Sequence, residues 1–306
     1  MRGSGSRRGV ALLLVLWALV LLGTLALGFS WSMRTEAMAA RNAIDEERAW
    51  FQARTGVNRA VVLLASLPAD NVMAAEIAGE DGDASYEVRI ESESGKVDVN
   101  LVTEDVLLEM LKRGGLPEEE AESVRDAILD WRDADDVPRP RGAERAEYER
   151  TADPVTPRNG RFRSVGELMC VRGVTRRFHD VFLSRVFTVH GNSAQVNFLR
   201  APRIVLGSLP GVSAAAVDRI VAGRRENPPI TAADLAAMAG EGLLTAQGLS
   251  LLSGGSASRV YTVTATGRAG NDVTRIVRCL VEVAGSGKKG VKMLEWRDKA
   301  PREEGG

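Results

Sequence analysis

The sequence is poor in the side chains that most often carry out catalysis. It holds two histidines and two cysteines, and aromatic residues make up 5% of its 306 positions. Neither a Ser-His-Asp arrangement nor a phosphate-binding loop is recognisable. Asp130 with Asp133 or Asp136 would suit an acid and base pair, but the scarcity of aromatics gives no sign of a sugar cleft. We therefore expect a protein that is not an enzyme.

The chain also lacks an excess of either charge. Its 40 Lys and Arg residues nearly balance its 41 Asp and Glu residues, and the pI is about 6.3. A general surface for polyanions needs a basic excess, so nucleic acid is not expected as a partner.

One long segment lacks charge altogether. No charged residue lies between Arg8 and Arg34, and residues 10–33 are rich in Leu. A helix of this length would cross the roughly 30 Å hydrocarbon core of a bilayer, and it is too long for the apolar part of a secretory signal peptide. Basic residues precede it, so the positive-inside rule predicts a cytoplasmic N-terminus and an exported body.

The helical pattern does not stop where the membrane would. From Arg34 to about Leu67 apolar residues recur on one side of a helix and charged residues occupy the other, and no proline interrupts the run before Pro68. The membrane segment and this extension are therefore expected to form one continuous helix.

Two later stretches alternate apolar and polar residues with a period of two. One runs through 86–99 around a turn at 93–95, and the other runs through 260–281 around a Gly- and Asn-rich turn at 267–272. Each predicts a β-hairpin. The expected fold class is α+β, with the long N-terminal helix packed on an antiparallel sheet.

The segment between the predicted hairpins is helical and repeats itself. Gly, Pro and cap residues divide it into helices at 103–113, 117–132, 164–170, 175–186, 202–208, 213–225, 231–239 and 244–252. Val97-Asp98-Val99-Asn100 and Val196-Asn197-Phe198 each precede a helix that ends in a turn, at Gly114-Gly115 and at Leu209-Pro210-Gly211. We expect an inserted α-helical domain of SAM-like or helix-hairpin-helix repeats.

The second turn, Leu209 to Val212, resembles the helix-hairpin-helix motif, which in nucleic-acid proteins presents backbone N–H groups to a phosphate. Arg219, Arg224 and Arg225 follow it, so a membrane-anchored DNA receptor of the competence type is the alternative function. The first turn is instead followed by the acidic stretch 118–122, which would repel phosphate. Such modules serve protein contacts equally well.

Acidic residues gather at the end of the predicted helix 117–132 and in the loop after it. The helix macrodipole is negative there, so concentrated carboxylates need an offset. Oxygen ligands on an irregular Pro- and Gly-containing loop suit Ca²⁺, and no His or Cys lies close by for zinc. The candidate ligands are Asp130, Asp133, Asp135, Asp136, Glu144 and Glu147. The alternative is a solvated acidic turn whose charges pair with Arg132, Arg139, Arg141 and Arg145.

The N-terminal layout resembles that of type IV pilins and pseudopilins, with a short basic leader, a Gly and an apolar helix. The resemblance implies that the prepilin peptidase cuts after Gly9 and that the new N-terminal residue, Val10, is methylated. Most of these proteins have Glu at the fifth mature position, where it neutralises the amino terminus of the subunit above; here that position is Leu14. Because a buried unpaired ammonium is costly, Leu14 suits a tip subunit rather than a repeating one. An ordinary signal anchor with a coiled continuation is the alternative.

The body of the chain resembles the type II secretion system protein K family. The segments that carry this resemblance are D-W-x-D-x-D at 130–135, G-A-E at 142–144 followed by Tyr148, and PRNGRFRSVGEL at 157–168. They imply a minor pseudopilin anchored in the inner membrane. It would join the I- and J-type minor pseudopilins at the tip of a periplasmic pseudopilus and help to start its assembly for protein secretion.

These expectations divide the chain into a leader at 1–9, a transmembrane helix at 10–33, its periplasmic extension at 34–67, a first part of the β-body at 68–100, the inserted helical domain at 101–255, a second part of the β-body at 256–284 and a disordered tail at 285–306. Both cysteines, Cys170 and Cys279, lie in the exported part, where a disulfide is permitted. Two separately buried thiols are the alternative.

Overall fold

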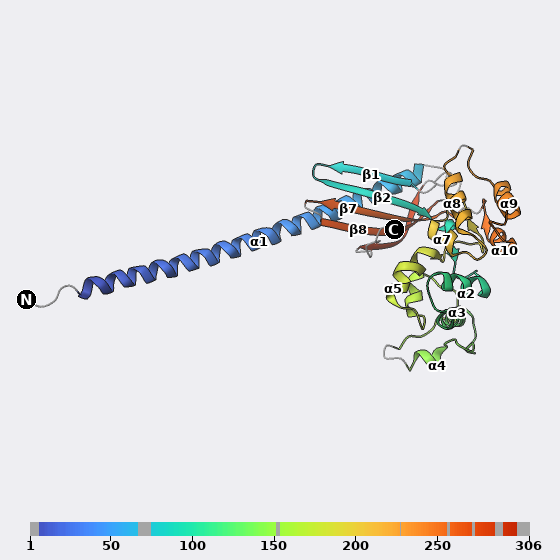
Figure 1. The fold of residues 1–306 in the computed structure, drawn as a ribbon, viewed down its shortest axis with the longest axis horizontal. Coiled ribbons are helices and arrows are strands. Elements are labelled where there is room, and N and C mark those ends of the chain that lie inside the picture. Colours follow the sequence, from blue (N-terminus) through green and yellow to red (C-terminus); the bar gives the residue numbers. More distant parts are fainter. Residues whose placement is uncertain are drawn as a thin grey trace, which may run out of the picture.

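The computed structural model shows a long helix that leads from the N-terminus into a β-sheet, with shorter helices gathered at the far end of the sheet (Figure 1). The residues that it describes are 6–66, 75–150, 154–226, 228–255, 258–270, 273–284 and 290–298. The first part of the predicted leader and most of the predicted tail lie outside these residues.

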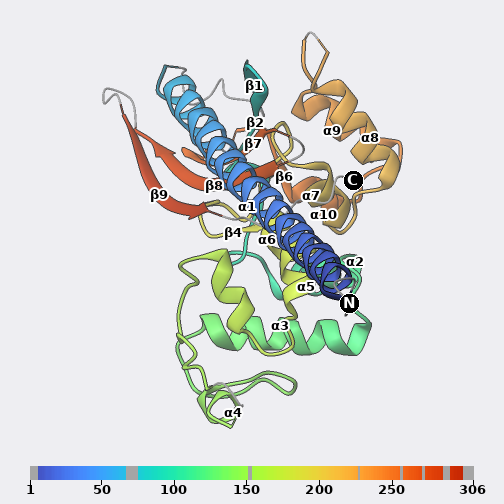
Figure 2. The ribbon, with the colours of Figure 1, turned by 90° about the vertical axis from the view of Figure 1, so that its left-hand side faces the viewer.

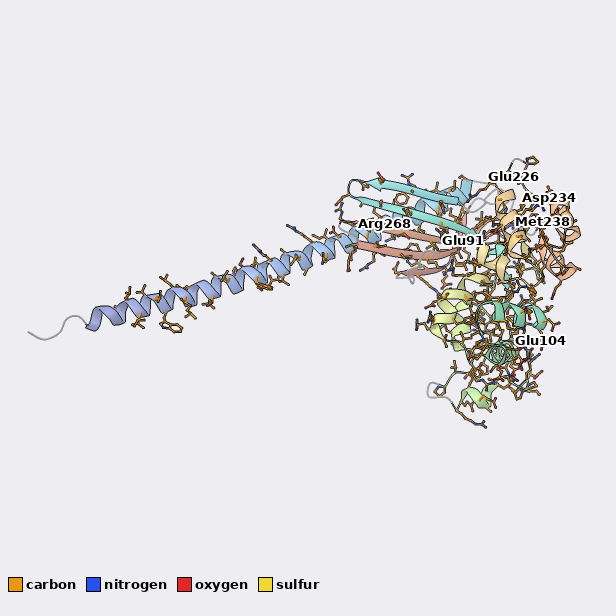
Figure 3. All side chains as sticks on the ribbon, in the orientation of Figure 1. Glu91, Glu104, Glu226, Asp234, Met238 and Arg268 are labelled. Carbon is orange, nitrogen blue, oxygen red and sulfur yellow. The ribbon has the colours of Figure 1, made fainter. Side chains whose placement is uncertain are left out.

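Helix α1 (Ser6–Ser66) contains the whole apolar segment and its extension. Every residue from Ala11 to Ile44 is exposed, and its side chains project freely from the helix (Figure 3). Within the described residues, α1 is the one helix long and apolar enough to cross a membrane. The predicted continuous helix is confirmed, and its free half is consistent with a single-pass membrane anchor.

The sheet is antiparallel throughout and has the strand order β1-β2-β7-β8-β9. Its strands are β1 (Ala75–Asp81), β2 (Ala84–Ser92), β7 (Val260–Ala269), β8 (Val273–Val283) and β9 (Val291–Asp298). Because β2 and β7 are neighbours, everything between them in the sequence is an insertion at one end of the sheet. The predicted α+β arrangement of a long helix and an antiparallel sheet is confirmed.

The second half of α1 packs on the sheet through a stripe of small and branched residues: Ala49, Ala53, Val57, Ala60 and Leu64, all fully buried. Their spacing of three or four residues places them on one face of the helix. The helix lies so close to β7 that a Cβ at Gly267 would overlap with the backbone of Ala49 and Ala53. Glycine is therefore required at this crossing, because any side chain would push the helix away from its core.

The strand predictions need two corrections. The hairpin partner of β2 is β1, which precedes it; Val97 and Val99 were predicted as that partner but leave the sheet after a 3₁₀ turn, η2 (Glu93–Gly95). The predicted disordered tail is also wrong for residues 291–298, because β9 pairs with β8 there as the edge strand. The second predicted hairpin forms as expected between β7 and β8.

The insertion consists of short helices and two-residue strands. After η2 they are β3 (Val97–Asp98), α2 (Glu104–Arg113), α3 (Glu118–Arg132), α4 (Arg145–Tyr148), the 3₁₀ helix η3 (Val165–Cys170), α5 (Arg176–Phe178), the π-helical turn η4 (His179–Leu183), α6 (Ser184–Val186), β4 (Phe187–Thr188), β5 (Val196–Asn197), α7 (Arg203–Ser208), α8 (Ala214–Gly223), α9 (Ala232–Gly240), α10 (Ala246–Ser250) and β6 (Leu252–Ser253). Viewed along α1, α3 and α4 lie at the bottom and α8 and α9 at the upper right (Figure 2).

Two segments of the insertion, here called the first and the second copy, have similar strand pairing and similar turns. In the first, β3 pairs in parallel with β4; in the second, β5 pairs in parallel with β6. Directly after the opening strand, the carbonyl of Asp98 accepts from Leu101 and Val102, and the carbonyl of Asn197 accepts in the same way from Arg200 and Ala201. The two segments thus share one turn geometry, although the sequence resemblance to helix-hairpin-helix motifs stays a prediction.

In each copy an arginine donates hydrogen bonds to the turn after the opening strand. The guanidinium of Arg132, at the end of α3, donates to the carbonyl oxygens of Val99 and Val102, at 2.6 and 2.9 Å. That of Arg224, directly after α8, donates to the carbonyl oxygens of Phe198 and Ala201. Each arginine therefore ties the second helix of its copy to the turn that starts the copy.

The sheet and the insertion have separate apolar cores, and a buried ion pair lies where they meet. Lys96 Nζ lies 2.6 Å from Glu93 Oε1, and that oxygen also accepts from the hydroxyl of Thr262 on β7 at 2.7 Å. Burial alone would raise the pKa of Glu93, but Lys96 and the hydroxyl donors lower it below its usual range. This network fixes the start of the insertion to the sheet.

Candidate functional site

The acidic loop rests on a cluster of three aromatic rings. Trp131, near the end of α3, stacks on Phe162 with a centroid distance of 6.1 Å and meets Tyr148 edge-on at 5.5 Å. All three are buried. The three sequence segments that resemble protein K thus come together in one place, because each supplies one ring of this cluster.

Three of the six predicted metal ligands converge on one point. Carboxylate oxygens of Asp133, Asp135 and Glu144 all lie within 4.8 Å of one another. Asp133 directly follows α3, Asp135 lies two residues further on, and Glu144 precedes α4. The loop between α3 and α4 therefore folds back on itself, so that residues distant in sequence present their oxygens to one point.

Glu144 is the most unusual member of this group. It is 98% buried, as its exposed fraction is 2%. Its carboxylate faces the backbone N–H of Glu147 in the capping box of α4, but neither oxygen makes a hydrogen bond among the described residues. Oδ1 of Asp133 is likewise buried without a partner there. Burial first, and then the charges of Asp130, Asp133, Asp136 and Asp135, raise the pKa of Glu144 to about 7. A carboxylate in this position needs either a proton or a cation.

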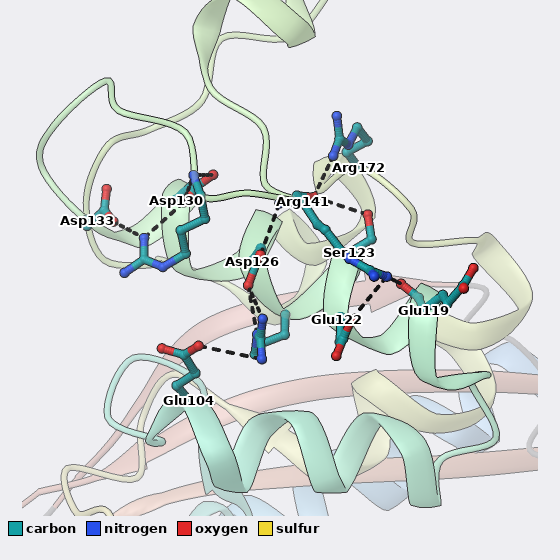
Figure 4. A network of polar contacts seen from close by, with 11 residues as sticks. Glu104, Glu119, Glu122, Ser123, Asp126, Asp130, Asp133, Arg141 and Arg172 are labelled. Carbon is teal, nitrogen blue, oxygen red and sulfur yellow. Dashed lines mark hydrogen bonds and ion pairs between the residues drawn. The ribbon is translucent and has the colours of Figure 1, made fainter.

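The other three predicted ligands have protein partners. Asp130 is fully buried and accepts from the Arg139 guanidinium at 2.9 Å, which also binds Asp133 at 2.7 Å (Figure 4). Asp136 accepts from the side chain of Asn159 at 2.7 Å. Glu147 accepts from the backbone N–H of Glu144 at 3.0 Å and so caps α4.

Of the four arginines expected to neutralise the loop, Arg139 does so, whereas Arg141 pairs with a residue of helix α3. Arg139 binds Asp130 and Asp133, and Arg141 pairs with Glu122 at 3.0 Å (Figure 4). Arg132 instead donates to the carbonyl oxygens of the turn after β3. The side chain of Arg145 makes no hydrogen bond or ion pair with the described residues. The arginines therefore neutralise Asp130 but leave Glu144 without a counter-charge.

Two residues that sequence analysis did not assign to the site give the loop its shape. Asn159 has a positive φ of 46° and holds both Asp136 and the carbonyl of Asp135. Gly142 lies against the carboxylate of Asp130, so that a Cβ there would overlap with it. Both had signals in the sequence, since Asn tolerates the left-handed region and Gly142 belongs to the G-A-E segment.

The residues proposed for processing and tip position lie on the free half of α1. Gly9 and Val10 are on the helix, although their side chains lie outside the described set, and Leu14 is 65% exposed. None of these observations tests cleavage or methylation, which stay predictions.

The basic residues after the second turn do not form a phosphate-binding surface. The guanidinium of Arg224 donates to the carbonyl oxygens of Phe198 and Ala201, and burial lowers the pKa of Arg224 to about 10. Arg219 pairs with Glu241 at 2.5 Å. Of the three arginines that motivated the DNA-receptor alternative, only Arg225 makes no described side-chain contact, so that alternative is not favoured.

The two cysteines do not form a disulfide. Cys279 is buried in the sheet, where burial raises the pKa of its thiol to about 12, and Cys170 is exposed at the end of η3. The disulfide prediction is therefore wrong, and the alternative of two separately buried thiols holds only for Cys279. The two segments lie in different cores, which explains why the residues do not meet.

A long apolar N-terminal helix whose second half packs on an antiparallel sheet defines the pseudopilin class of membrane-anchored proteins. Comparison with known proteins narrows this class. A family model described as type II secretion system (T2SS), protein K, matches residues 71–188. This match and the likeness to a solved structure together support a type II secretion system protein K, a minor pseudopilin.

A solved structure has the same fold. It is a chain of the crystal structure of the GspK-GspI-GspJ complex from the type 2 secretion system of enterotoxigenic Escherichia coli. The TM-score is 0.56 at 13% sequence identity, over 88% of this chain and 99% of that one. At this identity the likeness concerns the fold alone. No curated protein sequence matches the chain significantly.

Proposed function

We propose that this minor pseudopilin forms the tip of a periplasmic pseudopilus together with I- and J-type minor pseudopilins and helps to start its assembly. The position of the insertion carries this proposal. It projects at the end of the sheet farthest from the free half of α1, where a following subunit would have to stack (Figure 1). Leu14 supports the same position, since it offers no carboxylate to a subunit above.

An exposed apolar stripe on α1 supports helix-to-helix contact with these partners. Ile44, Phe51 and Val62 are 59%, 57% and 66% exposed. At about 100° per residue they lie within roughly 20° of one another around the helix, on the side opposite to the stripe that packs on the sheet. Single exposed apolar residues are common on soluble surfaces, but three on one side of a helix that continues from the membrane segment suit contact with the apolar helices of neighbouring subunits.

The experiment is copurification of the full chain with the I- and J-type subunits from membranes. Phe51→Asp and Val62→Asp should each weaken the complex strongly, because they place a charge in a helix interface. Ala43→Asp is the matched control: Ala43 is exposed on the same helix but lies about 100° from the stripe, and it should leave the complex intact. Equal recovery with all three variants would overturn the proposed contact.

We further propose that the acidic loop binds Ca²⁺ through Asp133, Asp135 and Glu144. The unpartnered buried carboxylate of Glu144 supports this, since a cation would supply the charge that the protein does not. Three carboxylates within 4.8 Å suit the oxygen-rich, flexible shell of Ca²⁺ better than the strict octahedron of Mg²⁺. Ca²⁺ should raise the melting temperature of a fragment from Arg34 onward, and Asp133→Ala with Asp135→Ala should abolish that rise.

A further inference from the structure

A second polar site lies between the sheet and the insertion. A cavity of about 360 Å³ opens between strands β8 and β9 of the sheet and the segments η3, η4, α6 and β4 of the insertion. Both histidines of the chain line it, together with three arginines: Arg163, Arg278 and Arg297. Its size is in the range of small-molecule binding sites.

The placement of two of these arginines has no evident structural benefit. Arg278 on β8 is the register partner of Arg297 on β9, so the two charges lie directly opposite each other on neighbouring strands. Like charges in this position destabilise a sheet. Glu295 offsets Arg297 through an ion pair, whereas the only described contact of the Arg278 guanidinium is a weak one, 3.5 Å to the carbonyl of Ser184.

The remaining charges of the cavity wall are also informative. The Arg163 guanidinium makes no hydrogen bond or ion pair within the described part of the chain. The nearby carboxylate of Glu167 accepts from the Arg163 backbone N–H at 3.2 Å and from the Arg158 guanidinium in two hydrogen bonds of 2.9 Å. Glu93 and Lys96 line the wall but neutralise each other. Among the described residues, Arg163 and Arg278 thus have no carboxylate partner at this cavity.

We propose that this cavity binds an oxyanion, a carboxylate or a phosphate group, between the guanidinium groups of Arg163, Arg278 and Arg297. Guanidinium groups pair with both kinds of group through two parallel hydrogen bonds. Arg297 reaches the insertion side of the cavity: a Cβ at Gly166, three residues after Arg163, would lie 3.2 Å from Arg297 Nη2. A bound anion offsets the repulsion between Arg278 and Arg297, which explains why the fold keeps them opposite each other.

The test is calorimetric titration of the detergent-solubilised full chain with sodium phosphate and, separately, with sodium citrate. At least one should bind saturably, and the preferred one identifies the anion as a phosphate or a carboxylate. Arg278→Gln and Arg163→Gln should each weaken binding at least about tenfold, the effect of losing charge-assisted hydrogen bonds. Arg177→Gln, on exposed α5 outside the cavity, removes the same charge and should leave the affinity within about twofold.

A stability measurement separates loss of binding from loss of folding. In buffer without phosphate or citrate, Arg278→Gln should melt at or above the temperature of the unaltered protein, because it removes a like-charge pair. Absence of saturable binding for both anions, or equal affinity of Arg278→Gln and the unaltered protein, would overturn the proposal.

Discussion

Replacement of Glu144 by Gln should make the protein more stable at neutral pH in the absence of calcium. The substitution keeps the shape of the side chain but removes a charge that is 98% buried and has no partner among the described residues. Most substitutions of buried residues destabilise a protein, so the expected sign is unusual. It follows from the surroundings of Glu144, where burial and four nearby carboxylates oppose ionisation.

The size of the effect follows from the pKa. In the unfolded chain Glu144 has its ordinary pKa of 4.5, and in the folded chain the pKa is about 7. A raised pKa means that the contribution of this group to stability is fully present below about pH 4.5 and is lost as the pH rises through about 7. The loss is about 3 kcal/mol, or roughly 5 to 10 °C in melting temperature for a domain of this size.

The assay is thermal unfolding, with and without chelator, of a fragment from Arg34 onward, which retains every contact between α1 and the sheet. With chelator, the difference in melting temperature between Glu144→Gln and the unaltered protein should grow in favour of the variant from pH 4.5 to pH 8. With Ca²⁺ at pH 8 the order should reverse, because only the unaltered protein gains from a ligand that binds the folded state.

Glu149→Gln provides the matched control. Glu149 follows α4 and is exposed, so its loss should change neither the pH dependence nor the response to Ca²⁺. If Glu144→Gln and the unaltered protein lost stability in parallel between pH 4.5 and pH 8, ionisation of Glu144 would not cause the pH-dependent loss of stability. If both responded equally to Ca²⁺, Glu144 would not be a ligand.

Three further outcomes are expected. Mass spectrometry of the membrane form should show a chain that begins at methylated Val10, and an intact leader through Gly9 in a strain with active prepilin peptidase would contradict the pseudopilin processing. Leu14→Glu should not increase incorporation along the filament. The carboxylate costs about 2 to 3 kcal/mol in the membrane, and a tip subunit has no amino terminus above it whose pairing would offset this cost. Abundance of the variant along the filament by immunogold labelling would refute this. Lys96→Met should lower the free energy of unfolding by about 3 to 5 kcal/mol in urea titration, whereas the double change with Glu93→Gln should restore most of it.

Much of the fold was predictable because its signals are local. The long helix could be recognised from an uncharged run followed by one-sided apolar spacing, and the helices of the insertion from caps and Gly or Pro breaks. The hairpin of β7 and β8 could be recognised from its turn. Each of these signals extends over a few residues, and the energies behind them act over the same distance.

The errors concern pairing between segments. Val97 and Val99 have the alternation of a strand, but β3 pairs with β4, which lies about 90 residues away in sequence. The position beside β2 is occupied by β1 instead. Strand β9 lies in a Gly- and Lys-rich tail whose composition favours disorder, yet the edge of β8 offers it hydrogen-bond partners. Composition and alternation indicate that a strand can form, and only the packed sheet decides which neighbour it takes.

The sequence by itself determined the membrane helix, the α+β class and the acidic loop, because hydropathy, periodicity and charge density are properties of neighbouring residues. The tertiary structure decided which carboxylates meet. Asp130, expected as a ligand, is paired with Arg139, and Glu144 is left as a buried charge without a partner in the described part of the chain. It also decided that Arg278 and Arg297 face each other beside a cavity. Whether a charge is paired depends on groups that the folded chain brings within a few ångströms, and sequence separation carries almost no information about that distance.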